Sequence, residues 1–581
     1  MFKSLLRRLT APHFLYLYCV LSLAIPNVAL CFTEHMPLLA CVANVVLPVA
    51  VYAWLMSLSA NTGRQVWRVF LLIFFAAFQI VLLYLYGRGV IAVDMFLNLV
   101  TTNPGEAMEL LGNLIPAVGT VVVVYVPLLV LATVSWTRHR KLTDRRFLCL
   151  ARRSSLVGMA AGAAIIATAY AAYPKDSDFD YRAEDHVYPA NVFYNLYLAC
   201  RESYRTAHYQ DRVAKYRFGA RSTHPSDTAE VYVLVIGETA RAENFQLYGY
   251  RRPTNPLLMQ TTGLCVFSHV LSQSNTTHKS VPMLLSASSA EDHNRLYREK
   301  SIISAFREAG FHTSFISNQL PNHSFIDFFG AEADDFVFIR EDVGNDVDNG
   351  SADLAAATSD DRLLPYVKRI LDRRRPKELI VLHTYGSHFN YRDRYPQQRA
   401  FFRPDTPTEA EAKNRPQLVN AYDNTIRQTD RLLHSVISML QTRGVQAAML
   451  YTSDHGENIF DDARQRFLHA SPVPSAHDVH VPLIVWMSAQ YRCAYPHMVE
   501  ALDANRQKDV QSSASVFPTL LSLAGINSPR IADVMPLSLA NPAYRARRRH
   551  YLNDHNRAVT LRQAGFDRLD LEELRKWGVK E

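Results

Sequence analysis

The sequence predicts two structural parts, a helical membrane domain followed by an α/β domain with a mostly parallel sheet. Residues 1–174 contain five apolar runs of about membrane-spanning length. From Glu230 onward, short β-rich runs alternate with helical ones. Hydrophobic residues make up 49% of the 581-residue chain, yet the mean hydropathy is only -0.07. This combination fits very apolar segments joined to an ordinary soluble region.

Each apolar run approaches the ~20 residues that a transmembrane helix needs. The expected spans are Phe14 to Cys31, Pro37 to Ala60, Val69 to Tyr86, Ile115 to Trp136 and Leu156 to Tyr173. Five such runs in succession are not expected from the buried helices of a soluble protein. The first run follows basic residues, as a signal peptide would, but its length and the four later spans predict that it is retained.

Basic residues between the spans predict the orientation, because cytoplasmic loops carry an excess of lysine and arginine. They lie before the first span, between the second and third, and most densely from Arg138 to Arg153. The long link from Gly87 to Leu114 has only Arg88. With five spans, the chain after residue 174 then lies outside the cytosol. The net charge of +8 is therefore mainly a topology signal, and no nucleic-acid partner is expected.

The exported part divides into three segments by composition. Residues 175–229 are charged and rich in tyrosine, which predicts interfacial linker helices resting on the membrane; a plain solvated linker is the alternative. Residues 230–540 form the main exported domain, and residues 541–581 form a basic C-terminal tail whose role the sequence does not reveal. Only Cys200, Cys265 and Cys493 lie in the exported part, so no disulfide framework is indicated.

Short continuous apolar runs in the main exported domain are typical of buried parallel strands. They are Val231 to Ile236, His312 to Ser317, Leu379 to His383, Ala447 to Thr452 and Leu483 to Trp486. Helices are expected at Ser301 to Ala309, Leu363 to Arg373 and Gln417 to Arg443. In parallel sheets of this kind, ligands bind outside the carboxyl ends of the strands.

Polar side chains follow three of these strands. Glu238 follows the first, His383 and His388 lie at and after the end of the third, and Asp454 and His455 follow the fourth. Such oxygen and nitrogen ligands suit zinc, whose catalytic sites keep one position open, and manganese also accepts them. A lone Asp-His pair is commonly a surface turn. Three strand ends with such residues together predict a metal site.

A metal site of this kind can activate a hydroxyl group for attack on a phosphoryl centre. The polar loop from Ser272 to Pro282 precedes the apolar run Met283 to Leu285. A hydroxyl at the start of a helix here would lie near backbone N–H groups that favour anions. Thr276, Thr277 and Ser280 are comparable candidates on these grounds, and simple helix capping is the alternative.

Several motifs resemble those of the phosphoethanolamine transferases, which belong to the alkaline phosphatase and sulfatase superfamily. They are Gly237-Glu238-Thr239-Ala240-Arg241, Thr-x-x-Ser-Val-Pro at Thr277 to Pro282, His-x-x-Gly-Ser-His at His383 to His388, Ser453-Asp454-His455-Gly456-Glu457, and Val516 to Gly525. The resemblance covers nearly the whole chain, including the five spans. It implies an alkaline-phosphatase/sulfatase-like α/β/α sandwich as a periplasmic catalytic domain at residues 230–540.

The resemblance also implies roles for individual residues. Zinc would be held by Glu238, Thr277, Asp454 and His455, with Thr277 as the nucleophile. His388 and His469 would contact the substrate phosphate or hold a second metal ion, so the number of metal ions stays open. Further substrate-binding candidates are Asn318, His383, Asn98 and Glu106, the last two in a link that resembles a family segment near the lipid entrance.

The chain departs from the lipid A enzymes of the family in three places. Gln273 and Met283 occupy positions where a disulfide often brackets the threonine loop. A lysine that some members place shortly after Asn318 is missing. The stretch Asp461 to Pro474 looks more like the branch that acts on core-sugar phosphates. These differences leave the catalytic step intact and leave the acceptor open.

The implied activity is transfer of phosphoethanolamine from phosphatidylethanolamine to a lipopolysaccharide acceptor, either lipid A or a core sugar phosphate, through a phosphoethanolamine-threonine intermediate at the zinc site. A monomer in the bacterial inner membrane is expected, with its catalytic domain in the periplasm and a link to polymyxin resistance. The alternatives are a phosphoglycerol transferase of the same superfamily, a membrane-bound sulfatase or phosphodiesterase, and a non-catalytic scaffold. The Gly-Glu-Thr and Thr-x-x-Ser-Val-Pro motifs favour phosphoethanolamine.

Overall fold

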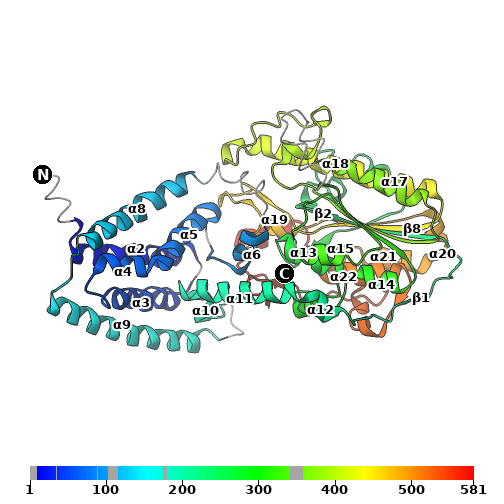
Figure 1. Ribbon diagram of the computed structural model, residues 1–581. Helices are drawn as coiled ribbons and strands as arrows, with labels where there is room; N and C mark the ends of the chain where they lie inside the picture. The colour runs from blue at the N-terminus through cyan, green and yellow to red at the C-terminus, as the bar shows by residue number, and fades with distance from the viewer. Residues whose placement is uncertain are drawn as a thin grey trace. The chain divides into compact units, whose positions relative to one another are not determined.

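The computed structural model describes residues 9–34, 36–87, 89–101, 115–174, 179–322, 324–340 and 358–580. The chain folds into two compact units, residues 1–201 and 202–581 (Figure 1), which are described here one at a time. Of the predicted site residues, Glu106 lies outside the described ranges.

The first unit is built from apolar helices. In chain order they are α2 (Pro12–Thr33), α3 (Leu38–Met56), α4 (Thr62–Arg68), α5 (Phe70–Tyr86), α6 (Val93–Thr101), α8 (Ile115–Thr137) and α9 (Arg145–Ala172). Within the described residues, four helices are long and apolar enough to cross a membrane, or five if α4 and the start of α5, bent by 62°, count as one span. The prediction of an N-terminal helical membrane domain is confirmed. The third expected span corresponds to α5, which reaches the length of a span only together with α4, across the bend.

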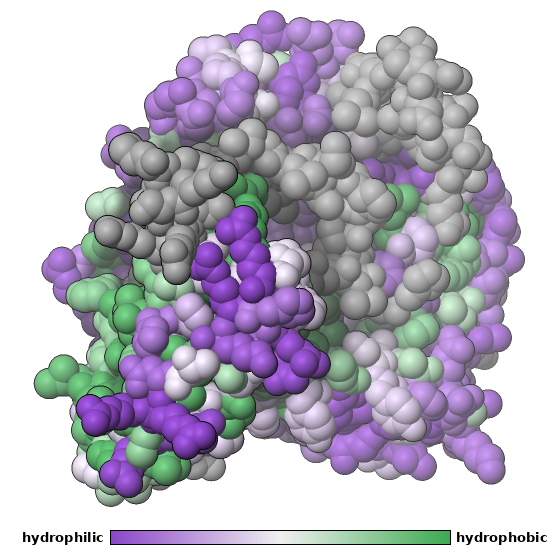
Figure 2. Space-filling model, turned by 60° about the vertical axis from the view of Figure 1, so that its left-hand side comes forward, coloured by the Kyte–Doolittle hydropathy of each residue, from purple (hydrophilic) through white to green (hydrophobic). Residues whose placement is uncertain are grey.

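Large apolar side chains of these helices are exposed. Leu21 of α2 is 66% exposed, Val123 of α8 is 71% exposed and Val157 of α9 is 69% exposed. Figure 2 shows hydrophobic residues at the molecular surface beside hydrophilic ones. Soluble proteins rarely expose extended apolar surface, because its contact with water costs free energy. The outer face of these helices therefore suits contact with lipid.

The second unit is organised around a seven-stranded sheet with the strand order β3-β11-β8-β2-β7-β5-β6. The strands are β2 (Glu230–Gly237), β3 (Leu264–Phe267), β5 (His312–Ser317), β6 (Asp335–Phe338), β7 (Lys377–His383), β8 (Gln446–Ser453) and β11 (Leu483–Met487). β2, β5, β6, β7 and β8 pair in parallel. The predicted mostly parallel sheet is confirmed.

One strand runs against expectation. β11, predicted as a parallel strand, is antiparallel to both of its neighbours, β8 and β3. If β11 ran parallel to β8, the connection between them would need a crossover of a dozen or more residues, usually a helix that spans the sheet. Within residues 454–482 the structure has instead two short strands and the four-residue helix α19 (Ala476–Val479). The chain therefore re-enters the sheet from the edge at which β8 ended.

Both faces of the sheet are covered by helices, so its strands are buried on both sides. Val231, Val233 and Val235 of β2 pack in the core that includes residues of α17 (Leu364–Asp372) and α18 (Arg415–Arg443). The alternate residues of β2 pack in the opposite core, with α13 (Thr277–Leu285), α14 (Ile302–Glu308), α15 (Phe325–Gly330) and α22 (Ser512–Leu523). Figure 1 shows these two groups of helices on opposite sides of the sheet. The three predicted helices are therefore present at α14, α17 and α18.

The segment expected to be a linker contains α10 (Ala183–His186), α11 (Ala190–Ala207) and α12 (Tyr209–Val213). Tyr197 and Tyr204 are exposed, as an interfacial role requires. Tyr188 and Tyr209 are buried instead, and the Tyr209 hydroxyl donates a hydrogen bond to the Glu299 carbonyl oxygen at 2.9 Å. Only some of these tyrosines are therefore available to a membrane surface.

The C-terminal tail packs against the second unit. It contains the strands β14 (Tyr551–Leu552) and β15 (Ala558–Val559) and the helix α23 (Arg568–Lys576). Leu571 and Leu574 of α23 share an apolar cluster with Ala476 and Val479 of α19. The tail is therefore packed into the folded unit and can contribute to its surfaces.

Candidate metal centre and nucleophile

Adjacent strands bring the first two predicted ligands together. Gly237, the last residue of β2, pairs with Ser453, the last residue of β8. The next residues are Glu238 and Asp454, and the Asp454 N–H donates to the Gly237 carbonyl oxygen at 3.0 Å. Because parallel strands end at the same edge, both carboxyl groups emerge side by side. Both side chains are buried.

The predicted nucleophile lies against these ligands. Thr277 is the first residue of α13. Its Oγ1 lies 3.1 and 3.2 Å from the two carboxylate oxygens of Glu238 and 3.2 Å from Nε2 of His455. Glu238, Thr277 and His455 thus converge from segments that are far apart in the sequence.

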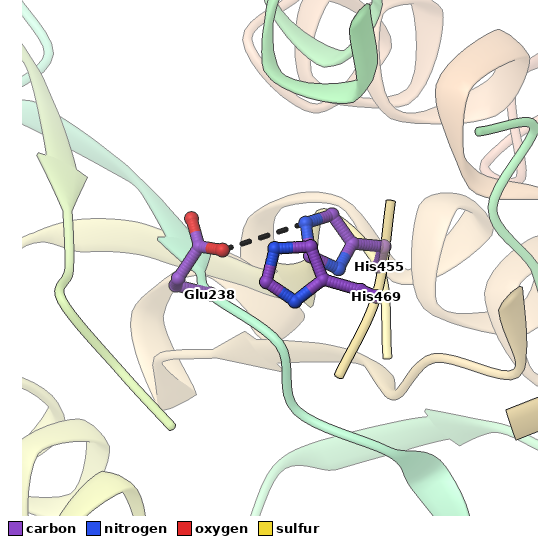
Figure 3. A group of neighbouring side chains, drawn as sticks. All are labelled: Glu238, His455 and His469. Atoms are coloured by element: carbon purple, nitrogen blue, oxygen red, sulfur yellow. Dashed lines mark ion pairs between the residues drawn. The ribbon is translucent and has the colours of Figure 1, made fainter. Parts of the chain in front are cut away.

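A second histidine joins the group. Figure 3 shows Glu238, His455 and His469 grouped together, with a dashed line for the 3.4 Å ion pair between Glu238 and His455. One ligand atom from each of the three lies within 4.8 Å of the others. Asp454 borders the group, since its Oδ2 lies 3.3 Å from Nε2 of His455.

Hydrogen-bond acceptors outnumber donors in this group. The Nδ1 of His455 lies 2.8 Å from the Gly456 carbonyl oxygen, which can only accept, so Nδ1 carries the hydrogen and Nε2 has a free lone pair. The buried Oδ2 of Asp454 has no hydrogen-bond partner among the described residues. Within the described part of the chain, the Glu238 carboxylate accepts from one donor besides Thr277, the side-chain amide of Gln319 at 3.0 Å. The group therefore lacks positive charge.

The pKa values of these side chains reflect the lack of positive charge around them. Burial and the neighbouring Asp454 carboxylate raise the pKa of Glu238 to about 8. Burial also raises the pKa of Asp454 to about 7, despite hydrogen bonds that oppose the shift. Burial and the nearby His469 lower the pKa of His455 to about 4, which leaves its imidazole neutral near pH 7. Without a cation, these side chains favour their uncharged forms.

Zinc fits this arrangement. Two buried carboxylates, one of them with an unpartnered oxygen, and an imidazole with a free Nε2 provide the oxygen and nitrogen ligands that zinc prefers. The hydrogen bond from His455 to Gly456 is the outer contact that orients a metal-binding histidine. Glu238, Asp454 and His455 would hold the ion, with Thr277 beside it.

His388 and His469 lie next to each other. Their ring centroids are 5.7 Å apart, and those of His469 and His455 are 4.3 Å apart. The Nδ1 of His469 pairs with the buried Glu457 carboxylate at 2.8 Å, and the Nδ1 of His388 lies 2.6 Å from the Phe389 carbonyl oxygen. Burial lowers the pKa of both rings, that of His469 to about 4. Both rings are oriented by contacts behind them.

Two other predicted substrate residues, Asn318 and His383, have partners outside this group. The Asn318 amide donates to the Thr358 carbonyl oxygen at 2.9 Å and to Asp360 at 2.8 Å. His383 contacts the Ser317 hydroxyl at 3.2 Å. Within the described residues, neither side chain forms a hydrogen bond with Glu238 or Thr277. Asn98 lies on α6 in the first unit.

The residue that does reach the carboxylate is Gln319, which sequence reasoning missed. It follows Asn318 directly after β5 and was not among the predicted site residues, and the predicted substrate role of Asn318 stays a prediction. Its amide also donates to the Thr384 carbonyl oxygen at 3.0 Å. The polar run at the end of β5 was the available signal. Glu457, the partner of His469, was part of a recognised motif without an assigned role.

The backbone around Glu238 is tightly constrained. Thr239 has a φ of 53°, a rare conformation for a β-branched residue that is typical of functional sites. Its N–H donates to Asp454 at 3.2 Å and its carbonyl oxygen accepts from the Tyr422 hydroxyl at 2.6 Å. At Gly386, an added Cβ would come within 2.6 Å of the Glu238 carbonyl oxygen. A close approach of two backbones thus fixes the ligand.

The threonine loop is held by buried polar contacts at Gln273, one of the two positions where the resemblance implied a disulfide in other members. The Gln273 amide nitrogen donates to Gln511 at 2.8 Å and to Glu291 at 3.1 Å, and its amide oxygen accepts from the Ala290 N–H at 3.2 Å. The backbone carbonyl of Gln273 accepts from the Leu552 N–H of the tail at 2.7 Å. Hydrogen bonds to several distant segments therefore anchor this loop.

The ligand assignment can be checked with a matched pair of histidines. We expect His455→Ala to lose at least one equivalent of zinc per chain, because it removes an imidazole whose Nε2 faces Glu238 and Thr277. His383→Ala should retain the ion, since His383 is equally buried at a neighbouring strand end but contacts Ser317. Metal content of the purified full-length proteins is measured by inductively coupled plasma mass spectrometry. Equal zinc in both variants would contradict the assignment.

Metal binding should also release protons. In the metal-free site the pKa values of Glu238 and Asp454 are raised to about 8 and about 7, so near pH 6.5 both carboxyl groups are largely protonated. Zinc requires the ionised forms, so its apparent affinity should rise with pH until about pH 8 to 9. Calorimetric titrations in buffers of different ionisation enthalpy measure the released protons. The same release at about pH 6.5 and about pH 9 would show that these carboxyl groups do not bind the ion.

The fold has known counterparts. Residues 230–526 match the sulfatase family. The chain is 29% identical over 315 residues to the Kdo(2)-lipid A phosphoethanolamine 7''-transferase of Salmonella typhimurium, covering 52% of this chain and 53% of that protein. It is 27% identical over 383 residues to the putative transferase YhbX of Escherichia coli, covering 64% and 62%. The chain thus spans about half to two thirds of the length of these curated relatives.

Solved structures show the same fold. Lipooligosaccharide phosphoethanolamine transferase A (EptA) from Neisseria meningitidis superposes with a TM-score of 0.68 and 20% identity, over 91% of this chain and 98% of that one. The zinc complex of the periplasmic domain of EptC from Escherichia coli superposes with a TM-score of 0.52 and 22% identity, over 59% and 95%. With the family match extending over half of its length, the chain belongs to the sulfatase family.

Proposed function

We propose that this chain transfers phosphoethanolamine from phosphatidylethanolamine to a lipopolysaccharide acceptor, lipid A or a core sugar phosphate, through a covalent intermediate on Thr277. The observation that carries this proposal is the position of the Thr277 hydroxyl, within 3.2 Å of both Glu238 and His455. The curated relatives named for phosphoethanolamine transfer to lipid A support this choice of substrate.

In the first step, Oγ1 of Thr277 attacks the phosphorus atom of the donor. A phosphorus–oxygen bond to Thr277 forms as the bond to diacylglycerol breaks. Thr277 starts α13, so backbone N–H groups at the helix N-terminus favour the negative charge of the phosphoryl group. Zinc bound by Glu238, Asp454 and His455 would lower the pKa of a neighbouring hydroxyl and offset charge on the phosphoryl oxygens.

One proton must move from the Thr277 hydroxyl to the departing diacylglycerol oxygen. His469 and His388 lie beside the site and can relay it. Glu457 bonds Nδ1 of His469 and would stabilise the imidazolium that forms for a moment during transfer. In the second step, a phosphate or hydroxyl oxygen of the acceptor attacks the phosphorus atom, and the bond to Thr277 breaks. The acceptor proton returns by the same histidines.

The membrane domain fits these substrates. Phosphatidylethanolamine has two acyl chains and stays in the bilayer, so its transferase benefits from anchoring in the same membrane. The four to five apolar helices supply that anchor. The basic links between the spans lie in the cytoplasm, because cytoplasmic loops carry an excess of lysine and arginine. With five spans, the catalytic domain is then periplasmic. The chain acts as a monomer in the bacterial inner membrane.

The nucleophile can be tested against its neighbour. Thr277→Ala should reduce transfer on the order of 10³-fold or more, because it removes the attacking oxygen. Thr276→Ala is the matched control. Thr276 is the N-cap residue of α13, and its buried hydroxyl contacts the Ser274 hydroxyl at 3.2 Å. Mass spectrometry of envelope glycolipids from cells expressing each variant shows which glycolipid gains phosphoethanolamine.

The donor is tested by feeding labelled phosphatidylethanolamine or phosphatidylglycerol to the purified wild-type enzyme. The label of the ethanolamine headgroup should appear on the glycolipid. Transfer of glycerol phosphate would contradict the donor assignment, and unchanged transfer by Thr277→Ala would contradict the nucleophile.

A further inference from the structure

The second unit has a cavity of about 550 Å³ in addition to the metal centre. Tyr248, Tyr250, Arg251, His480, Lys576 and Trp577 are among the residues that line it. Its volume lies within the range of about 300–1,000 Å³ that is usual for small-molecule sites. The C-terminal tail, whose role the sequence did not reveal, thus supplies part of its wall.

Backbone hydrogen bonds connect the wall of the cavity to the segments that carry the metal ligands. One wall is the segment that follows Glu238, and its Ala242 N–H donates to the His480 carbonyl oxygen at 3.0 Å. The Gly456 N–H, next to the ligand His455, donates to the Asp478 carbonyl oxygen at 2.7 Å. An added Cβ at Gly456 would come within 2.0 Å of the His477 carbonyl oxygen. The segment containing His480 therefore packs directly behind the metal motif.

His480 lines this cavity and has one ring nitrogen without a hydrogen-bond partner among the described residues. Its side chain is 3% exposed, and its Nδ1 pairs with Glu243 at 3.1 Å. Its Nε2 is buried and has no hydrogen-bond partner among the described residues. Native proteins rarely leave such atoms unpartnered, because burial removes their bonds to water. A ligand with a hydroxyl group would complete this contact.

The charge at the cavity favours an anion. Arg251 is exposed and has no ion pair among the described residues, and Lys576 is exposed with Glu573 at 2.6 Å. The Glu243 carboxylate also lines the cavity, but His477 and His480 pair with it at 2.7 and 3.1 Å. Although burial opposes the shift, these two hydrogen bonds lower the pKa of Glu243 to about 2. Its negative charge is thus balanced locally. Arg251 remains for a ligand, and the exposed pair of Lys576 with Glu573 is weak enough for a phosphate to compete with it.

An aromatic surface completes the cavity. The Trp577 ring stacks on the His480 ring, with centroids 4.6 Å apart and planes 10° from parallel. Tyr248 and Tyr250 lie on the same cavity. Flat aromatic rings offer apolar area with polar edges, which suits the carbon face of a sugar ring beside its hydroxyl groups. Cations, a hydroxyl partner and an aromatic surface therefore occur together.

We propose that this cavity binds a phosphorylated saccharide, with the phosphate on Arg251 and Lys576, the sugar ring against Trp577 and a sugar hydroxyl on Nε2 of His480. Its identity as the acceptor glycan rests on the proposed function, whereas the binding chemistry does not. The site would then select an acceptor by its phosphorylated core region, beside the centre that carries out the transfer.

The test measures binding of a phosphorylated lipopolysaccharide core oligosaccharide, freed of its lipid, to full-length Thr277→Ala protein in detergent. The missing acyl chains prevent partition into micelles, and the missing nucleophile prevents turnover. Adding Arg251→Gln with Lys576→Gln should weaken binding by about tenfold or more, since both phosphate contacts are lost. Lys368→Gln on α17 removes one exposed, acid-paired lysine outside the cavity, as Lys576→Gln does inside it, and should leave binding unchanged.

Trp577 is tested in the same background. Trp577→Ala should weaken binding by a similar factor, whereas Trp577→Phe keeps an aromatic ring and should retain most of the affinity. Circular dichroism checks the fold, and the exposed Arg251 and Lys576 keep the proposal testable if Trp577→Ala does not fold. Unchanged binding in the double variant would overturn the proposal. Equal binding of the dephosphorylated oligosaccharide, or of inorganic phosphate alone, would also overturn it.

Transfer by the enzyme with Thr277 intact separates this proposal from the proposed function. Loss of oligosaccharide binding in the cavity variants, with no phosphoethanolamine transfer by the parent enzyme, would support the cavity and refute the function. Transfer by the parent enzyme, with unchanged oligosaccharide binding in the cavity variants, would support the function and refute the cavity proposal.

Discussion

A cluster of buried acceptors around one hydroxyl group determines how the rest of the site is built. Glu238, Asp454 and Nε2 of His455 converge near Oγ1 of Thr277, with few donors between them. Buried carboxylates are costly unless paired or bound to a metal ion. The arrangement therefore needs a cation, and the same cation would favour negative charge on the threonine oxygen and on a phosphoryl group. Catalytic potential and the need for a metal ion have one physical origin.

The surrounding structure holds that cluster in place. Parallel strands β2 and β8 end in register, which sets Glu238 beside Asp454. The close approach at Gly386 and the positive φ of Thr239 fix the backbone of the first ligand. Gln273 ties the threonine loop to residues near 290, 511 and 552. These contacts lower the conformational freedom of the ligands before any substrate binds, which is how a preorganised site reduces its energetic cost.

Strands and helices were predictable because their residues follow simple periodicity. The run His312 to Ser317 was predicted with both of its observed ends, whereas the direction of β11 depends on the path of residues 454–482, which periodicity does not describe. The convergence of Glu238, Thr277 and His455 followed from strand ends and recognised motifs. Gln319 turns toward the Glu238 carboxylate while its neighbour Asn318 turns toward Asp360, and only tertiary packing decides such a difference. The cavity beside Trp577 is formed by residues 243–251, Ser268, His480 and Lys576, which are far apart in the sequence and left no local signal.

Anomalous diffraction at the zinc edge, from crystals of the full-length protein grown with zinc, tests the central claim most directly. We expect a strong peak bonded to Glu238, Asp454 and His455, within about 2.0–2.2 Å of their oxygen and nitrogen atoms, with Oγ1 of Thr277 next to it. A peak confined to His388 and His469, or zinc bound with Thr277 turned away from it, would contradict the account.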